Sequence, residues 1–106
     1  MSWSDIKALE QIKKLGDIFN VLTFIETGTF KGVNASVQAA NFETVITCEI
    51  NEDYYWIAKQ NISPYKNVYV VNSDSSVFLE KMRGFIDSSP TPVMIYLDAH
   101  FYDSTL

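Results

Sequence analysis

The stretch that decides the fold is FIETGTFKGVN, residues 24–34. It joins an apolar run to a carboxylate, Glu26, and then places Gly28 and Gly32 four positions apart before a segment of helical period. Glycine adopts backbone angles that other residues avoid, and it lets a ligand or a neighbouring element approach the main chain closely. The stretch therefore predicts a strand, a tight turn and a helix, in which the turn is either a ligand-binding loop or a simple chain reversal.

Four short runs of β-type composition occur along the chain, and each is nearly continuous in apolar residues, as strands buried on both faces are. They span residues 21–26, 45–50, 68–72 and 93–98. Segments of helical period separate them, and a charged amphipathic segment that starts at Ser4 precedes the first run. The alternation predicts an α/β, Rossmann-like doubly wound parallel sheet with four strands in the order 3-2-1-4 and helices on both faces.

The whole chain, residues 1–106, is predicted to be one domain, with a helix within residues 1–19 and the sheet core in residues 20–106. The first helix is expected to end near Gly16. In the helix after the first strand, Val33, Val37 and Ala40 are expected to share one face. The next two helices are expected to begin at two polar stretches, one starting at Asn51 and the other at Asp74. Sheets of this class usually continue beyond four strands, so the 106 residues resemble the first half of a larger sheet.

Composition narrows the choice of partners and compartment. Of 106 residues, 47% are hydrophobic and 20% are charged, which is enough apolar content for one folded core. The net charge of -5, without any basic run, disfavours nucleic acid and anionic lipid as partners. Cys48 is the single cysteine, and neither a signal peptide nor an apolar segment of membrane-spanning length is present, so a cytoplasmic protein without membrane association is expected.

An acidic residue lies at or just after the end of each predicted strand. These residues are Glu26, Glu49, Asp74 and Asp98. Because the carboxyl ends of parallel strands meet at one edge of the sheet, all four are expected at the same rim, where such folds bind ligands. The alternative is that they cap helices, a role expected of Asp74 in either case.

The glycine spacing argues against a dinucleotide. The G-x-G-x-x-G pattern would require glycine at positions 30 and 33, where this chain has Phe30 and Val33. A nicotinamide-dependent dehydrogenase is therefore disfavoured.

In four motifs that occur in order, ETGTFKG, CEIN, NSDSS and LDAH, the chain resembles the N-terminal, cofactor-binding half of class I S-adenosylmethionine-dependent methyltransferases. The resemblance covers about residues 20–100 and is strongest with a subgroup that carries LDAH or LDGH as the fourth motif and includes enzymes acting on small molecules. It implies S-adenosylmethionine as the cofactor and the cofactor-binding residues Glu26, Thr27, Gly28, Thr29, Gly32, Glu49, Ile50, Asp74, Ser75 and Asp98.

The resemblance also implies a role for each motif. The turn and Glu26 would lie beside the methionine moiety, Glu49 would bind the ribose hydroxyl groups, and Ile50 would pack on adenine. Asp74 and Ser75 would reach the adenine edge, and Asp98 would lie near the methyl donor and acceptor.

The candidate catalytic residues are Asp98 and His100, two positions apart at a strand end. His100 is considered as a general base or, alternatively, as a structural or solvent-facing histidine. One carboxylate and one imidazole are too few ligands for a divalent ion, so no metal site is predicted.

Two functions therefore compete at this point. The first is a methyltransferase that binds S-adenosylmethionine or S-adenosylhomocysteine and an unidentified methyl acceptor, with cofactor binding supported more directly than catalysis. The second is a non-catalytic, truncated Rossmann-like half-domain that acts as an interaction module. In either case the fourth strand, VMIYL, would present an open apolar edge, which predicts a homodimer through that edge.

Overall fold

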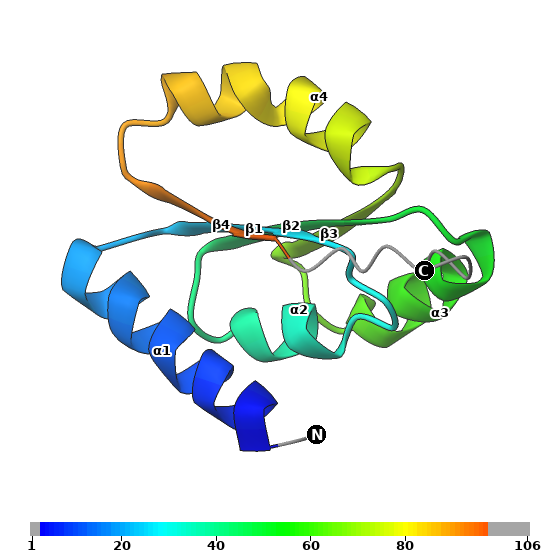
Figure 1. Cartoon of the computed structure of the whole chain (residues 1–106), viewed down its shortest axis with the longest axis horizontal. Coiled ribbons are helices and arrows are strands. Elements are labelled where there is room, and N and C mark those ends of the chain that lie inside the picture. Colours follow the sequence, from blue (N-terminus) through cyan, green and yellow to red (C-terminus); the bar gives the residue numbers. More distant parts are fainter. Residues whose placement is uncertain (1–2, 98–106) are drawn as a thin grey trace, which may run out of the picture.

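The structure is a computed structural model that describes residues 3–97, with side chains described from Lys7 onward. The elements in chain order are α1 (Trp3–Phe19), β1 (Thr23–Thr27), α2 (Val33–Gln38), β2 (Thr44–Glu49), α3 (Glu52–Ile62), β3 (Val68–Asn72), α4 (Ser75–Ser88) and β4 (Val93–Leu97). The four strands form one parallel sheet in the order β3-β2-β1-β4, which confirms the predicted topology. Figure 1 shows α4 on one face of the sheet and α1, α2 and α3 on the other.

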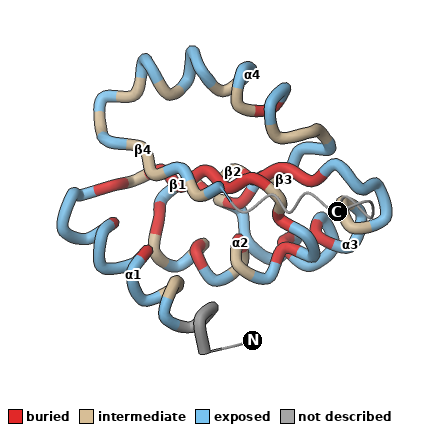
Figure 2. Tube along the Cα trace, in the orientation of Figure 1, coloured by how far each residue is buried: buried red, intermediate tan, exposed pale blue. Residues whose placement is uncertain are grey.

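The central strand β1 explains why the apolar runs are so continuous. All five of its residues are buried, because it lies between β2 and β4 and has helices on both faces. Successive side chains of a strand point to opposite faces. Phe24 accordingly packs with Val45 and Phe42 on the side of α1 to α3, whereas Ile25 packs with Phe78 of α4 on the other side. Figure 2 shows this buried band running through the sheet.

The first helix does not end near Gly16, where the glycine led us to expect its end. It passes through Gly16 and ends at Phe19, followed by Asn20 in the left-handed region at φ 53°. The N–H of Val21 donates to the carbonyl of Gly16 at 2.9 Å, a bond that closes a helix end with a left-handed residue inside it. Gly16 instead lies against the ring of Phe42, which a Cβ at position 16 would meet at 3.0 Å. The prediction was wrong because this glycine serves close packing rather than helix termination. No helix within residues 3–97 combines the length and the apolar character needed to cross a bilayer.

The predicted apolar face of α2 is also wrong. Val33 is 55% exposed, Val37 is 39% exposed, and Ala40 lies beyond the end of the helix. The buried positions of α2 are instead Ala35 and Gln38. A helix of only six residues cannot present a long apolar stripe, and this one turns a polar side chain toward the core.

The starts of α3 and α4 confirm the sequence prediction. The side-chain oxygen of Asn51 accepts a hydrogen bond from the N–H of Tyr54 at 3.1 Å, and Asp74 accepts one from the N–H of Val77 at 2.8 Å. Each cap satisfies a backbone donor that the first turn of a helix leaves free. The two caps also fix where the chain leaves β2 and β3, and hence the shape of the sheet edge at which those strands end.

Candidate functional site

A turn with three residues of positive φ follows β1. Gly28, Phe30 and Gly32 have φ values of 74°, 57° and 82°. The N–H groups of Gly28 and Thr29 both donate to the carbonyl of Cys48, at 3.0 and 2.8 Å, so the turn is attached to the end of β2. The left-handed conformations account for both glycines, and Phe30 adopts the same region at a cost of about 1–2 kcal/mol.

Gly32 has a second reason to lack a side chain. A Cβ at this position would lie 3.2 Å from Cγ2 of Ile62 and 3.3 Å from Cα of Ala58, both in α3. The start of α2 therefore packs directly against the main chain of α3. This contact agrees with the expectation that a glycine in this stretch lets a neighbouring element approach the main chain closely.

The outer side of the turn is also attached to α3. The ring centroids of Phe30 and Tyr54 lie 4.4 Å apart, and the amide of Asn61 donates to the carbonyl of Lys31 at 2.8 Å. Lys31 lies with its Nζ 5.4 Å from the centroid of the Phe30 ring. The turn is thus held from three directions, by Cys48, by the α2–α3 packing and by these surface contacts.

Glu49 connects the turn with the start of α3. Its side chain is 7% exposed, and its two oxygens accept hydrogen bonds from separate backbone amides, Oε1 from Phe30 at 2.8 Å and Oε2 from Asn51 at 2.9 Å. A carboxylate offers about four acceptor sites, so a ligand donor can still be added to each oxygen. The carboxylate is therefore fixed in place and retains capacity to accept hydrogen bonds.

Glu26 lies beneath the turn. It is 1% exposed, and its oxygens accept from the hydroxyl of Thr47 at 3.0 Å and from the side-chain amide of Asn34. Glu26 and Thr47 are direct neighbours in the parallel register of β1 and β2. The turn and α2 thus cover a buried, hydrogen-bonded carboxylate.

The segment after β3 completes the described part of the rim. The N–H of Ser73 and the side-chain amide of Asn72 both donate to the carbonyl of Glu49, at 3.2 and 2.9 Å. Asp74 follows, and the N–H of Val77, with a smaller contribution from nearby Ser76, lowers the pKa of its carboxyl below the ordinary value. The structure therefore brings Asp74 to the same end of the sheet as Glu49, where it caps α4.

Ser75 lies close to a buried thiol at this end of the sheet. Its hydroxyl interacts with Cys48, and burial raises the pKa of the Cys48 thiol. The thiol is fully buried. This agrees with an inert, structural cysteine rather than a nucleophile.

Three further predicted residues differ in exposure. Thr27 is 1% exposed and Ile50, directly after Glu49, is 69% exposed. Thr29 is buried, and its Oγ1 is the single buried side-chain polar atom without a hydrogen-bond partner in the part of the chain that the structure describes. The hydroxyl of Thr29 is thus an unused hydrogen-bonding group inside the turn.

Asp98 and His100 lie outside the described residues, so the predicted catalytic pair is not placed. Within residues 3–97, no three or more His, Cys, Asp or Glu side chains are arranged as a possible metal site.

Three residues of the hydrogen-bond network at Glu26 were not predicted from the sequence. Asn34 and Thr47 bond to Glu26 directly, and Gln38 bonds to Asn34. A signal was present, because Thr47 and Glu26 are polar residues inside two otherwise apolar strand runs that the predicted topology makes adjacent. Buried polar residues in neighbouring strands indicate a mutual hydrogen bond.

Taken together, the described rim offers one fixed carboxylate with spare acceptor capacity, a mostly buried turn with the half-buried Gly28 in it, and an adjacent exposed apolar side chain, Ile50. Such a combination can accept hydrogen bonds from paired hydroxyl groups and pack against a flat apolar ring. It contains no cluster of lysine or arginine residues that would bind a polyphosphate.

Several solved structures with a similar fold are named as methyltransferases. An O-methyltransferase from Bacillus cereus, in complex with S-adenosylhomocysteine, matches with a TM-score of 0.68 and 23% identity, covering 93% of this chain and 46% of that one. A protein from Klebsiella pneumoniae assigned as an O-methyltransferase gives 0.71 and 17%, covering 93% and 44%. The 23S rRNA methyltransferase ErmE gives 0.60 and 22%, covering 93% and 37%.

No sequence-family profile and no curated protein sequence matches the chain. The chain spans less than half the length of the three methyltransferase structures. Its four-stranded parallel sheet in the order 3-2-1-4 therefore has a Rossmann-like, methyltransferase-type fold.

Proposed function

We propose that this chain binds S-adenosylmethionine and forms the cofactor-binding part of a methyltransferase. The observation that carries the proposal is the position of Glu49, whose carboxylate is hydrogen-bonded to the turn after β1 and lies beside the segment that leads to Asp74. In a doubly wound sheet this edge is the ligand site, and an acid at the end of the second strand suits the two hydroxyl groups of a ribose.

Each part of the rim then has a role toward the cofactor. Glu49 accepts hydrogen bonds from the ribose hydroxyls, and the exposed side chain of Ile50 packs on adenine. Asp74 and Ser75 contact the adenine edge. The methionine part lies along the turn, which comprises Thr27, Gly28, Thr29 and Gly32, with Glu26 beneath it.

The unpaired hydroxyl of Thr29 tests whether this turn fits a polar ligand. A buried polar group without a partner costs about 1–3 kcal/mol, and folded proteins rarely contain one. The threonine side chain exchanges its hydroxyl and methyl positions by a single χ1 rotation. A ligand that supplies a polar atom at the turn would offset this cost, so the residue present here supports the proposed site.

Bound S-adenosylmethionine would supply an activated methyl group on its sulfonium, which the nucleophile of an acceptor displaces. The contribution of this chain would be to bind and orient the cofactor so that donor and acceptor lie in line. Asp98 would orient the cofactor or the acceptor, and His100 would accept the acceptor's proton. The acceptor itself is proposed only as an unidentified molecule, with a small molecule favoured by the LDAH motif.

Isothermal titration calorimetry with S-adenosylhomocysteine tests the proposal. A folded sample, checked by circular dichroism, is expected to bind one equivalent with saturable heat, and NAD is expected to give none. A folded sample without heat at millimolar S-adenosylhomocysteine contradicts the proposed function.

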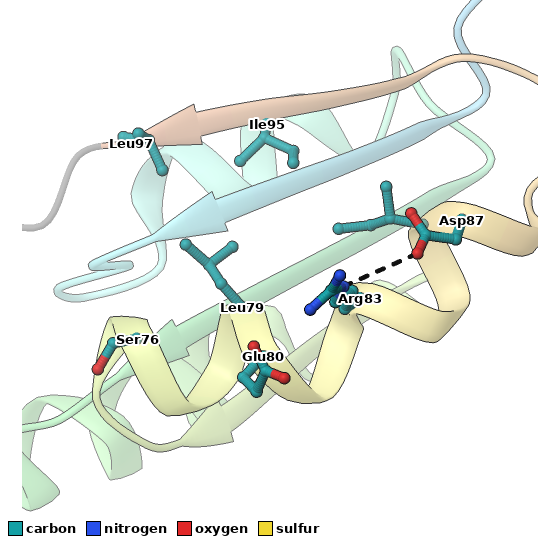
Figure 3. Close-up of a pocket in the computed structure, with 8 residues that line it drawn as sticks. Ser76, Leu79, Glu80, Arg83, Asp87, Ile95 and Leu97 are labelled. Carbon is teal, nitrogen blue, oxygen red and sulfur yellow. Dashed lines mark ion pairs between the residues drawn. The ribbon is translucent and has the colours of Figure 1, made fainter.

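A second candidate function is an interaction module that pairs through β4. Among the described residues, β4 is paired on one side only, with β1, and it carries neither charge nor proline to hinder pairing on the other. A groove of about 570 Å³ lies between β4 and α4, with Leu79, Ile95 and Leu97 along it. Figure 3 shows Arg83 and Asp87 at the border of this groove, in an exposed ion pair.

A second copy of the chain is the occupant that this edge suits, because an antiparallel β4–β4 pair would extend the sheet across a two-fold axis. Sedimentation equilibrium at high micromolar concentration is expected to give a dimer. Leu97→Lys, at a side chain 71% exposed, is expected to give a monomer, whereas Leu15→Lys on α1 leaves the dimer intact. A monomeric wild type would exclude this candidate without affecting cofactor binding.

A further inference from the structure

A continuous chain of side-chain hydrogen bonds leads to Glu26. Thr47 donates to one carboxylate oxygen at 3.0 Å, and Asn34 donates to the other. Behind Asn34, the amide of Gln38 donates to the Asn34 side-chain oxygen at 3.2 Å, and Asn41 donates to the Gln38 oxygen at 3.1 Å. Three of the five residues are almost completely buried, namely Thr47, Glu26 and Gln38.

The direction of these bonds is uniform. Asn34, Gln38 and Asn41 each turn their NH₂ group toward Glu26 and their oxygen away from it. Aligned amides polarise one another, so each bond strengthens the next toward the carboxylate. The chain of amides therefore both orients Glu26 and favours its negative charge.

The same residues replace the apolar stripe that a helix normally packs on the core. The helix α2 has only six residues, and Gln38 is one of its two buried positions. A glutamine is expensive to bury unless its amide is paired, and a leucine there would pack at less cost. Packing alone therefore does not account for a glutamine at position 38, whereas its hydrogen bond to Asn34 does.

We infer that Asn34, supported by Gln38 and Asn41, is a positioning residue that presents the Glu26 carboxylate to a cationic group of the ligand at the turn. This inference rests on the proposed function and adds a specific chemistry to it. Glu26 directly precedes Thr27 and Gly28, and the field of a buried carboxylate is weakly screened at such short range. The α-ammonium group of the methionine moiety is the cation that the proposed ligand supplies.

Two ligands separate positioning from general support. S-adenosylhomocysteine carries the ammonium group, whereas 5′-methylthioadenosine shares its adenosine thioether and lacks it. The quantity measured is the ratio of their dissociation constants by calorimetry. Glu26→Gln keeps the shape and removes the charge, and it is expected to reduce the preference for S-adenosylhomocysteine by about tenfold or more.

The supporting residues are expected to act in the same direction. Asn34→Ala is expected to reduce the preference by about threefold to tenfold, less than Glu26→Gln, because the charge of Glu26 remains and only its orientation is loosened. Gln38→Met, which keeps the length of the side chain, is expected to reduce it less. If Asn34→Ala does not fold, Gln38→Met and Glu26→Gln decide the question.

The matched control is Asn61→Ala, which removes a different contact to the same turn, the bond to the carbonyl of Lys31. It is expected to weaken both ligands equally. The inference is overturned if Asn34→Ala and Gln38→Met also weaken the binding of both ligands equally. In that case the proposed function still stands as long as the wild type binds S-adenosylhomocysteine. A wild type that binds neither ligand overturns the proposed function and this inference with it.

Discussion

Replacement of Gly32 by alanine tests how the turn and α3 are held together. The residue has φ 82°, and an added Cβ would lie 3.2 Å from Cγ2 of Ile62 and 3.3 Å from Cα of Ala58. The backbone conformation costs a residue with a Cβ about 1–2 kcal/mol. Crowding of this kind in a packed interior costs about 1–3 kcal/mol.

These two costs act on the folded state, whereas alanine also restricts the unfolded chain and returns about 0.4–1 kcal/mol. The net expectation for Gly32→Ala is a loss of about 1–4.5 kcal/mol in the free energy of unfolding. Small domains have about 5–15 kcal/mol in total, so the loss is a large fraction of it. The loss is large because the Ala58 contact is to backbone, which cannot move away as the end of a side chain can.

Urea denaturation followed by circular dichroism measures the effect. With a slope of about 2 kcal/mol per molar, the midpoint of Gly32→Ala is expected to fall by roughly 0.5–2 M. Gly84→Ala is the matched control, since Gly84 lies within α4 and its added Cβ would meet nothing within 4 Å. That control is expected to gain about 0.5–1 kcal/mol, because alanine favours a helix interior over glycine.

The two variants should therefore shift the midpoint in opposite directions. A midpoint for Gly32→Ala equal to or above that of the wild type would refute the close packing of α2 on α3. A similar fall for both variants would instead indicate a general sensitivity to alanine and would equally refute the argument.

Three further outcomes are expected. Glu49→Gln places an NH₂ group against a backbone N–H, so the urea midpoint is expected to fall. Calorimetry is expected to show S-adenosylhomocysteine binding about 10–100-fold more weakly, and an unchanged affinity would mean that Glu49 is not part of the site. Thr29→Val removes an unpaired buried hydroxyl, so the urea midpoint is expected to rise while the affinity for S-adenosylhomocysteine falls about threefold to tenfold. Thr29→Ser keeps the hydroxyl and is expected to keep the affinity. A lower urea midpoint in Thr29→Val would mean that the hydroxyl already has a partner. In the folded protein the pKa of Asp74 is lowered, chiefly by the hydrogen bond from the N–H of Val77. The ionised Asp74 therefore stabilises the fold at neutral pH, and this stabilisation is lost as the pH falls through the folded-state pKa. The urea midpoints of wild type and Asp74→Ala should therefore differ at pH 7 and converge in strong acid, and a constant difference would contradict this assignment.

The sequence predicted the positions of the strands well because short, nearly continuous apolar runs are typical of parallel strands. The expectation of burial on both faces holds for β1 but is wrong for the edge strands β3 and β4, most of whose residues are exposed or half-buried. The runs from residues 45–50 and 68–72 correspond to β2 at Thr44–Glu49 and β3 at Val68–Asn72. The strand order followed from the βαβ alternation and its fixed handedness, and the structure confirms it.

The errors arose where a residue serves a distant contact. From its neighbours in sequence, Gly16 was predicted to end a helix. A glycine is needed there instead because the ring of Phe42, 26 positions later in the chain, packs against it. Val33 and Val37 were predicted to be part of a core face, yet the buried positions of α2 are Ala35 and Gln38, and Gln38 bonds to Asn34 within the same helix. Sequence periodicity records which residues are apolar, and it does not show that a polar side chain has a buried partner.

The same limit explains what the sequence revealed of the candidate site. The position of Glu49 at the rim followed from the order of the strands. Its attachment to the N–H of Phe30 depends on the left-handed conformation of a phenylalanine, which no residue pattern indicates.

The attachment of Glu49 to two backbone amides has a consequence for how quickly and how tightly a ligand can bind. Both amides are already bonded to Glu49, so the surface proposed to bind the ligand is ordered in the folded chain. The entropy cost of ordering it is then part of folding and not of binding. Binding is then expected to involve little conformational change, with an association rate limited by diffusion and orientation. The mobility of the chain should differ little between the free and the bound protein.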